Sequence, residues 1–204
     1  MLFEDTYLTI AQPCEGIFKE KGSKFISFAY PVKTEEDIKI KIADLRKEHF
    51  NARHHCYAFR LGADKQAFRA NDDGEPKYTA GKPILSQIQS KDLTNILIIV
   101  VRYFGGTLLG TGGLINAYKL AAADALKDAE IIEKTVNDYY EIKFDYLQMN
   151  EIMKIIKDEN LEQVEHNFEL KCSLTFSVRK NNSNKVFEMF NKINNLEVKY
   201  LNTK

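Results

Sequence analysis

The chain has 204 residues, of which 44% are hydrophobic and 28% charged, with 29 basic and 29 acidic side chains. This length suits two small domains. Basic and acidic residues are equal in number both up to Glu133 and after it. The chain therefore lacks the excess of basic residues that is expected of a protein that binds mainly through phosphates. The first residues lack the features of a signal peptide, and the longest apolar run, residues 96–101, is too short to cross a bilayer. We therefore expect a cytoplasmic protein with no membrane partner.

The first 127 residues predict a succession of strands and helices. Thr34, with Asp37 three residues later, forms an approximate capping box for a helix that runs to about His49. Residues 54–61 predict a strand whose successive side chains point to opposite faces. The other predicted elements are strands at 6–10, 16–24, 25–32, 68–71 and 97–101, a loop at 72–76, a helix beginning near 81–83, a glycine loop at 103–113 and a helix at 114–127.

The remaining residues predict a second domain. Residues 128–134 are interpreted as the domain junction. The elements that follow are strands at 135–144, 161–165, 170–178 and 196–201, with helices at 146–158 and 182–193. This β-α-β-β-α-β order is typical of the ferredoxin-like pattern. The sequence therefore predicts an α+β chain with domains at 1–131 and 135–204.

The stretch from Arg102 to Gly113 carries five of the ten glycines within nine residues, between a buried strand and a helix. Glycine permits positive φ and close backbone approach, and free N–H groups at the start of a helix can receive an anion. The spacing fits neither the dinucleotide fingerprint nor the P-loop, because Lys119 comes too late in the helix. The alternatives are a tight turn under an alanine-rich helix, an anion contact and a protein contact.

The segment from Asn51 to Tyr57 contains adjacent histidines. On a strand, His54 and His55 point to opposite faces, so they cannot easily bind one metal, although His54 and Cys56 share a face. The three cysteines of the chain are widely spaced and odd in number, which disfavours a disulfide framework or a zinc ribbon. We expect no metal site, no cofactor and no catalytic residue.

The loop at 72–76 holds three carboxylates in four residues, Asp72, Asp73 and Glu75. Such a group could hold Mg²⁺ or supply an acid and a base, but it lacks the EF-hand spacing. A surface turn made by Asp73 and Gly74 is the simpler interpretation. The residues considered for a pocket are His54, Asp72, Asp73, Glu75, Tyr103 and Phe104.

Five segments, in this order, together resemble the Impact / YigZ family: Glu15–Phe25, Ala52–Ala58, Asp72–Pro76, Thr79–Ile84 and Val101–Leu114. The resemblance covers the first domain nearly end to end. The second domain looks like the short ferredoxin-like domain of bacterial YigZ-type members.

The resemblance implies a ribosomal-protein-S5-domain-2-like fold for the first domain and, for the second, a fold similar to the last domain of translocation factor G. These two fold types lie side by side in that factor at the ribosome. Eukaryotic Impact proteins regulate translation by competing for the activator of a starvation-sensing kinase. Their companion domains differ, so that pathway is not carried over to this chain.

The function predicted from these observations is non-catalytic binding of RNA or the ribosome, linked to translation regulation. Tyr103 and Phe104 are expected to stack on bases. The residues expected to contact phosphates, or to let the backbone approach them, are Arg53, Arg69, Lys82, Arg102, Gly105, Gly106, Gly110, Gly112 and Gly113. One alternative is an enzyme that acts on a phosphorylated or anionic small molecule in a cleft between the 72–76 and 102–113 loops. A second alternative is a protein-interaction module of translational control.

Overall fold

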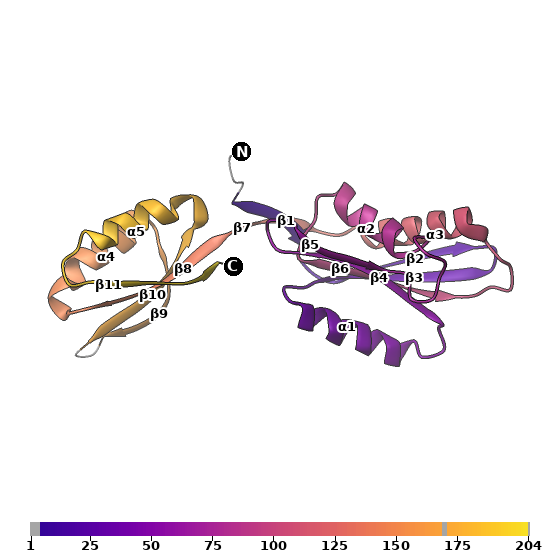
Figure 1. Ribbon diagram of the computed structural model, residues 1–204, viewed down its shortest axis with the longest axis horizontal. Coiled ribbons are helices and arrows are strands. Elements are labelled where there is room, and N and C mark those ends of the chain that lie inside the picture. The colour runs from indigo at the N-terminus through magenta and orange to yellow at the C-terminus, as the bar shows by residue number, and fades with distance from the viewer. Residues whose placement is uncertain (1–4, 169–170, 204) are drawn as a thin grey trace. The chain divides into compact units, whose positions relative to one another are not determined.

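The computed structural model describes residues 5–168 and 171–203, which divide into two compact units (Figure 1). The first unit comprises residues 7–134, and the second unit comprises residues 5–6 and 135–203. Both units combine helices with antiparallel sheets, which confirms the predicted α+β class. No helix in the described part of the chain is long and apolar enough to cross a membrane.

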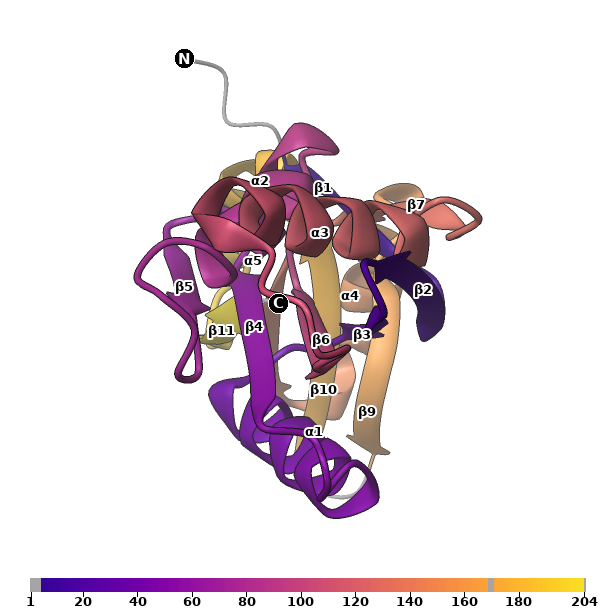
Figure 2. The same ribbon diagram turned by 90° about the vertical axis from the view of Figure 1, so that its right-hand side faces the viewer.

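The first unit is built on a five-stranded antiparallel sheet (Figure 2). In spatial order its strands are β2 (Cys14–Glu20), β3 (Ser23–Pro31), β6 (Ile96–Tyr103), β4 (His54–Leu61) and β5 (Ala67–Asn71). Figure 2 shows α2 (Gly81–Ser90) and α3 (Gly110–Ala125) on one face and α1 (Glu35–Glu48) on the other. Residues 96–102 of the central strand β6 are all buried, as expected for a strand covered on both faces.

Helix α1 begins as its sequence predicts. The Thr34 hydroxyl accepts a hydrogen bond from the Asp37 N–H at 3.1 Å, and the Asp37 carboxylate accepts one from the Thr34 N–H at 2.9 Å. This is the predicted capping box. The helix ends at Glu48, and His49 is its C-cap residue. Ile38 and Leu45 are buried and belong to the cluster on this face of the sheet.

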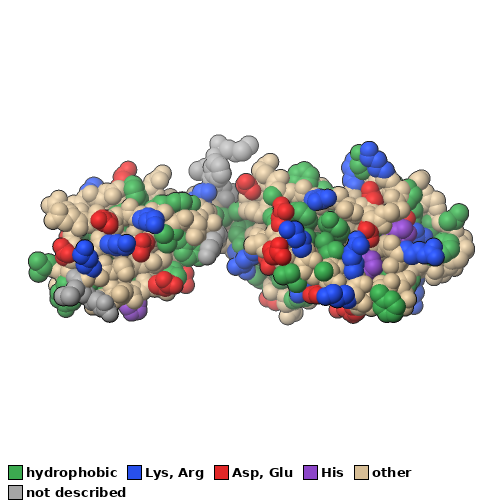
Figure 3. Space-filling view, turned by 60° about the horizontal axis from the view of Figure 1, so that its bottom comes forward, with side chains coloured by type: hydrophobic (Ala, Val, Ile, Leu, Met, Phe, Trp, Pro, Cys, Tyr) green, Lys and Arg blue, Asp and Glu red, His purple; other side chains and the backbone are tan. Residues whose placement is uncertain are grey.

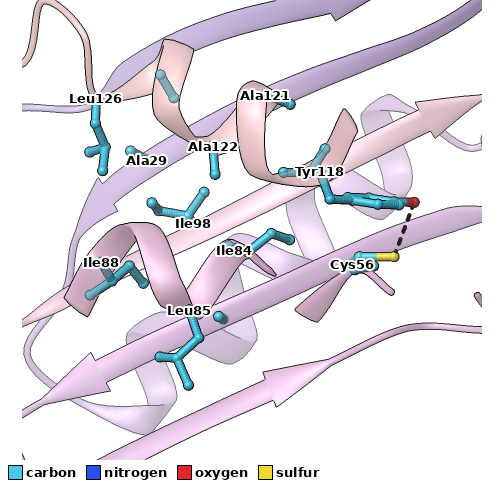
Figure 4. Close-up of a cluster of buried hydrophobic side chains, with 14 of the residues drawn as sticks. Ala29, Cys56, Ile84, Leu85, Ile88, Ile98, Tyr118, Ala121, Ala122 and Leu126 are labelled. Carbon is cyan, nitrogen blue, oxygen red and sulfur yellow. Dashed lines mark hydrogen bonds between the residues drawn. The ribbon is translucent and has the colours of Figure 1, made fainter. Parts of the chain in front are cut away.

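Helix α3 packs through small side chains on the opposite face. Ala117, Ala121 and Ala122 are fully buried. Figure 4 shows Ala121 and Ala122 in one cluster with Ile84 of α2 and Ile98 of β6. Alanine at these positions lets the helix backbone approach the sheet closely.

The predicted start of α3 was wrong by one turn. The helix begins at Gly110, so Gly110, Gly112 and Gly113 form its first turn rather than a loop, and β6 continues to Tyr103. Glycine costs about 1 kcal/mol per residue in a helix interior, which makes a helix start hard to recognise there. The burial of Leu114, Ala117 and Tyr118 outweighs that cost.

The segment assigned to a domain junction also contains a strand. β7 (Ile131–Thr135) pairs with β1 (Thr6–Ile10) in a separate two-stranded sheet. Just beyond these strands, the Ala11 N–H donates to the Glu130 carbonyl at 2.9 Å. The partner lies more than a hundred residues away in the sequence, so local patterns could not reveal this strand.

The second unit has a four-stranded antiparallel sheet in the order β11-β8-β10-β9, which is the ferredoxin-like arrangement. Its elements are β8 (Asn137–Phe144), η1 (Tyr146–Gln148), α4 (Met149–Asp158), β9 (Glu162–Phe168), β10 (Cys172–Arg179), η2 (Lys180–Asn182), α5 (Ser183–Asn191) and β11 (Glu197–Thr203). The predicted strand at 135–144 is interrupted at Val136, whose N–H donates to the Asp5 carbonyl at 2.7 Å. Residue 170, where another strand was predicted to begin, lies outside the described residues.

Candidate functional site

A cleft of about 740 Å³ lies in the first unit, where β4 begins, β6 ends and α3 begins. This volume is within the range of small-molecule sites. The polar side chains that line it come from Asn51, Arg53, His54, Glu75, Arg102, Tyr103 and Thr111. The other lining residues are Pro76, Phe104, Leu108, Leu109, Gly110 and Leu114.

Arg102 and Glu75 form a buried ion pair beside this cleft. The Arg102 Nη1 donates to Glu75 Oε1 at 2.6 Å, and the two side chains are only 7% and 4% exposed. The guanidinium also lies 5.5 Å from the ring centre of Phe25 and 5.7 Å from that of Phe104. Its Nε is buried without a hydrogen-bond partner among the described residues. Arg102 is therefore already paired, and only part of its donor capacity remains for a ligand.

The pair extends into a buried polar network. The Tyr118 hydroxyl donates to Glu75 Oε1 at 2.8 Å. The Cys56 thiol lies 3.3 Å from the Tyr118 hydroxyl and 3.0 Å from the Asp72 carbonyl (Figure 4). Burial is the main cause that raises the pKa of both the Cys56 thiol and the Tyr118 hydroxyl. Both groups stay protonated near neutral pH, so Cys56 lacks the thiolate that a nucleophile needs.

The acidic loop does not form one site. The Asp72 carboxylate accepts hydrogen bonds from the N–H groups of Tyr78, Ala80 and Gly81 at 2.8–3.0 Å, so it caps the start of α2. Because a sequence pattern does not show which backbone groups lie nearby, this role was missed.

Asp73 is also engaged away from the cleft. Its carboxylate accepts from the His55 N–H at 2.7 Å and from Arg46 Nη2 at 2.6 Å. The three carboxylates therefore have separate partners, and the described residues contain no group of three side chains suited to a metal ion. Of the residues predicted for a pocket, His54, Glu75, Tyr103 and Phe104 line the cleft, whereas Asp72 and Asp73 do not.

His54 is held in a defined orientation. Its Nδ1 lies 2.9 Å from the Asp73 carbonyl oxygen. A carbonyl oxygen can only accept, so Nδ1 carries the proton and Nε2 remains available to a ligand in the cleft.

The glycines of the 102–113 stretch have different roles. Gly105 packs against the backbone of Gly22, where a Cβ atom would lie only 1.9 Å from the Gly22 carbonyl carbon. Gly106 and Gly110 have φ values of +89° and +69°, which favour glycine. Gly112 is explained neither by a close contact nor by a positive φ. A Cβ atom added at this position would have no described atom within 4 Å, apart from its chain neighbours and the backbone of its own helix.

The predicted basic residues do not form one groove. Arg53 and Arg102 line the cleft. Arg69 pairs with Phe59 in the β4–β5 register and lies on the α1 face of the sheet. Lys82 is exposed in the first turn of α2, and its Nζ lies 5.5 Å from the ring centre of Tyr78. On the face shown in Figure 3, basic and acidic side chains of the first unit are interspersed.

Sequence reasoning missed the apolar part of the cleft. Leu108, which is 83% exposed, lies with Leu109 in the loop before α3. Two adjacent leucines inside a glycine-rich stretch were the signal available in the sequence, since such loops are usually polar.

Comparisons with known proteins all point to the same family. Residues 21–126 match the Impact N-terminal domain. An IMPACT family member of Haemophilus influenzae is 36% identical over 178 residues, which are 85% of this chain and 84% of the relative. The IMPACT family member YigZ of Escherichia coli is 38% identical over 74% of this chain and 76% of its own length. A crystal structure described as that of a hypothetical protein superposes with a TM-score of 0.74 at 29% identity, over 98% of this chain and 99% of the other.

Proposed function

The chain belongs to the Impact family, and we propose that it is a non-catalytic RNA- or ribosome-binding protein that acts in translation control in the cytoplasm. One observation carries this proposal. The cleft joins the open start of α3 to Arg53, Arg102 and the exposed ring of Phe104. Backbone N–H groups and arginine suit phosphate, and an exposed aromatic ring suits a base.

Binding of this kind would be local rather than general. The chain has no net charge, so few phosphates would be neutralised at one time. The logarithm of the binding constant falls by about 0.7 per phosphate contact for each tenfold increase in salt on single strands. We expect a shallow salt slope, in the range of about one to two, because the cleft offers Arg53 and one helix start.

A non-catalytic role is favoured by how the candidate acids are used. Asp72 and Asp73 are held by backbone and arginine partners, and Glu75 neutralises Arg102. Each carboxylate therefore has a structural partner, whereas a general acid or base must be free to meet a substrate.

The proposal is tested by filter binding of the full chain to single-stranded RNA at several salt concentrations. Arg53→Gln should weaken binding roughly 3- to 10-fold, as expected for a charge-assisted contact. Phe104→Ala should weaken it by about tenfold, as expected for loss of one stacked base.

Arg69→Gln is the matched control for charge, because Arg69 is exposed and lies outside the cleft. The control should bind like the unaltered protein. Equal losses at Arg53 and Arg69, or affinity no better than millimolar, would contradict the proposal.

A role as a protein-interaction module of translational control is the second candidate. The loop before α3 exposes 56% of Phe104 and 83% of Leu108, which is unusual for two neighbouring large apolar side chains. A pull-down from a cognate lysate, with and without nuclease, separates the two functions. A translation protein retained after nuclease treatment favours this candidate.

A further inference from the structure

We propose that a second cavity of the first unit, with a volume of about 520 Å³, is a binding site for a phosphate ester. This cavity, termed the lysine pocket, lies between β1, β7, the segment that joins β3 to α1, and α1 itself. Its charged lining residues are Lys33, Asp37, Lys41 and Lys134. It shares no lining residue with the cleft, so this site goes beyond the proposed RNA binding.

The first observation is the hydroxyl of Tyr7. The residue is only 9% exposed, and it lines the lysine pocket. Its hydroxyl keeps accessible surface but forms no hydrogen bond with any described residue. A tyrosine whose ring is buried usually finds a partner for its hydroxyl. A ligand with an acceptor oxygen in the pocket would supply that partner.

The second observation is the position of Lys134 relative to this hydroxyl. The hydrogen bonds that the Ala11 and Val136 N–H groups donate to the opposite strand flank the β1–β7 pairing. Equal numbers of residues separate the two bonds on the two strands, so the antiparallel register sets Lys134 opposite Tyr7. Directly opposite side chains share a face of a sheet. The ammonium group and the phenol hydroxyl therefore lie on the same side of the strand pair, and both line the pocket.

The third observation is that the lysine charge of the pocket is not neutralised. Neither Lys33, Lys41 nor Lys134 lies within ion-pair distance of a carboxylate in the described part of the chain. The Lys41 Nζ lies 5.2 Å from the ring centre of Tyr30. Asp37 also lines the pocket, but its carboxylate accepts from two backbone N–H groups as the cap of α1. Three positive charges and one negative charge leave the pocket with a net charge of +2.

Acidic residues close in sequence to these lysines are engaged elsewhere. Glu36 forms an ion pair with Lys39 at 3.4 Å. Glu133 precedes Lys134 in β7, so its side chain points to the other face of the strand. The positive charge of the pocket is therefore available to a ligand.

These groups indicate the class of ligand. Ammonium and phenol groups donate hydrogen bonds, so the ligand must bring several acceptor oxygens. A phosphomonoester carries close to two negative charges at neutral pH, which matches the charge of the pocket better than a single carboxylate does. Ile10 and Ile40 offer apolar surface to the organic part of the ester. Two sources share this chemistry, a free phosphorylated small molecule and the phosphate backbone of an RNA strand.

The experiment measures binding to the full chain by calorimetry, with amide shifts followed by NMR. The probes are phenyl phosphate, benzoate, inorganic phosphate and a short single-stranded RNA with hydroxyl ends, all at one ionic strength. Phenyl phosphate should bind about tenfold more tightly than benzoate, because it brings a second charge to the lysines. The largest amide shifts should fall on Tyr7, Lys33 and Lys134.

The same shifts identify the source of the phosphate. RNA that moves these three amides and displaces phenyl phosphate identifies an RNA strand as the ligand. RNA that leaves them unmoved, while phenyl phosphate shifts them, identifies a free phosphorylated molecule.

Tyr7→Phe removes only the hydroxyl and should weaken phenyl phosphate binding about tenfold, as expected for a hydrogen bond to a charged group. Its thermal unfolding should be unchanged, because the hydroxyl has no partner among the described residues. Lys134→Gln should also weaken binding about tenfold. Lys39→Gln is the matched control, because Lys39 is a lysine of α1 that is paired with Glu36 and lies outside the pocket. It should leave binding unchanged.

Three results would overturn the lysine pocket as a phosphate ester site. Benzoate that binds as tightly as phenyl phosphate removes the preference for phosphate, and inorganic phosphate that does so removes the ester. Equal losses in Lys134→Gln and Lys39→Gln indicate general attraction to surface charge. Phenyl phosphate binding that Tyr7→Phe does not weaken places the ligand elsewhere.

This proposal and the proposed RNA binding fail separately. A chain that binds RNA through Arg53 and Phe104 but binds no phenyl phosphate loses the lysine pocket and keeps the proposed function. A chain that binds phenyl phosphate but no RNA loses the proposed function and keeps the lysine pocket.

Discussion

Helices α2 and α3 start in opposite ways within one unit. The start of α2 is filled from inside the protein by the Asp72 carboxylate, which accepts from Tyr78, Ala80 and Gly81. The start of α3 receives no such group from the described side chains, and three of its first four residues are glycine. Both starts have the same unmet N–H groups, so the difference lies in what the chain supplies. A helix start that is satisfied internally serves the fold, whereas one that is left open can serve a ligand.

The largest effect on this contrast is expected from replacing Glu75, whose side chain lines the cleft beside the start of α3. Glu75→Gln leaves the Arg102 guanidinium buried without a counter-charge, so the free energy of unfolding should fall by about 3–5 kcal/mol. Urea denaturation measures the loss. The double variant Glu75→Leu with Arg102→Leu should recover most of it, because no buried charge remains. A single variant as stable as the unaltered protein would contradict the ion pair.

Removing the internal cap of α2 should have the next largest effect. Asp72→Ala deprives three backbone N–H groups of their acceptor and should lower the free energy of unfolding by about 2 kcal/mol. Asp128→Ala, at an exposed acid, is the control and should change stability by less than about 0.5 kcal/mol. If both variants lose the same amount, the cap is not what stabilises this helix start.

Filling the open start of α3 should raise stability. Gly112→Ala should add about 0.5–1 kcal/mol, because alanine is the better helix former and its Cβ meets no described atom. Gly113→Ala should add less, because its Cβ would lie 3.0 Å from the Leu109 Cβ. Differential scanning calorimetry ranks the two variants. A destabilised Gly112→Ala would mean that this glycine has a role in the fold after all.

The cap at the start of α1 contains a titratable carboxylate, so its contribution to stability should depend on pH. Hydrogen bonds from the Lys33 N–H and then from Thr34 hold the pKa of the Asp37 carboxyl below its usual value. The stabilisation from this cap is therefore fully present above the ordinary carboxyl pKa and is lost as pH falls through the lowered value. NMR titration of the Asp37 carboxyl carbon should give a midpoint below that of an unfolded peptide containing residues 33–39. An equal or higher midpoint would rule out the cap in solution.

The parts of this structure that could be predicted from sequence are those set by neighbours in the chain. The capping box of Thr34 and Asp37 and the strand at 54–61 depend on residues a few positions apart, and both predictions were confirmed. The strand is nevertheless buried on both faces, because α1 covers one side of the sheet and α2 and α3 the other. The α3 start was misplaced because glycine disfavours helix locally, while the packing that decides it involves α2 and the sheet. β7 was missed because its partner is β1.

The candidate site, like the fold, was predictable only where it depends on residues that are close together in the sequence. The position of the glycine stretch was visible in the sequence, but the use of each charge was not. Glu75 meets Arg102 and Tyr118, which lie 27 and 43 residues further along the chain. Such pairs depend on the sheet register that places β4 beside β6, and no local pattern reports it.

Because β1 pairs with β7, the chain enters and leaves the first unit at two neighbouring strands. Such a module can in principle be transplanted into another protein through a single short junction, because its two ends need no bridging segment. It also sets an order for synthesis. β1 emerges first, yet its partner strand follows only after about 120 further residues, roughly ten seconds at 5–20 residues per second. The earliest strand of the module is therefore the one that waits longest for its partner.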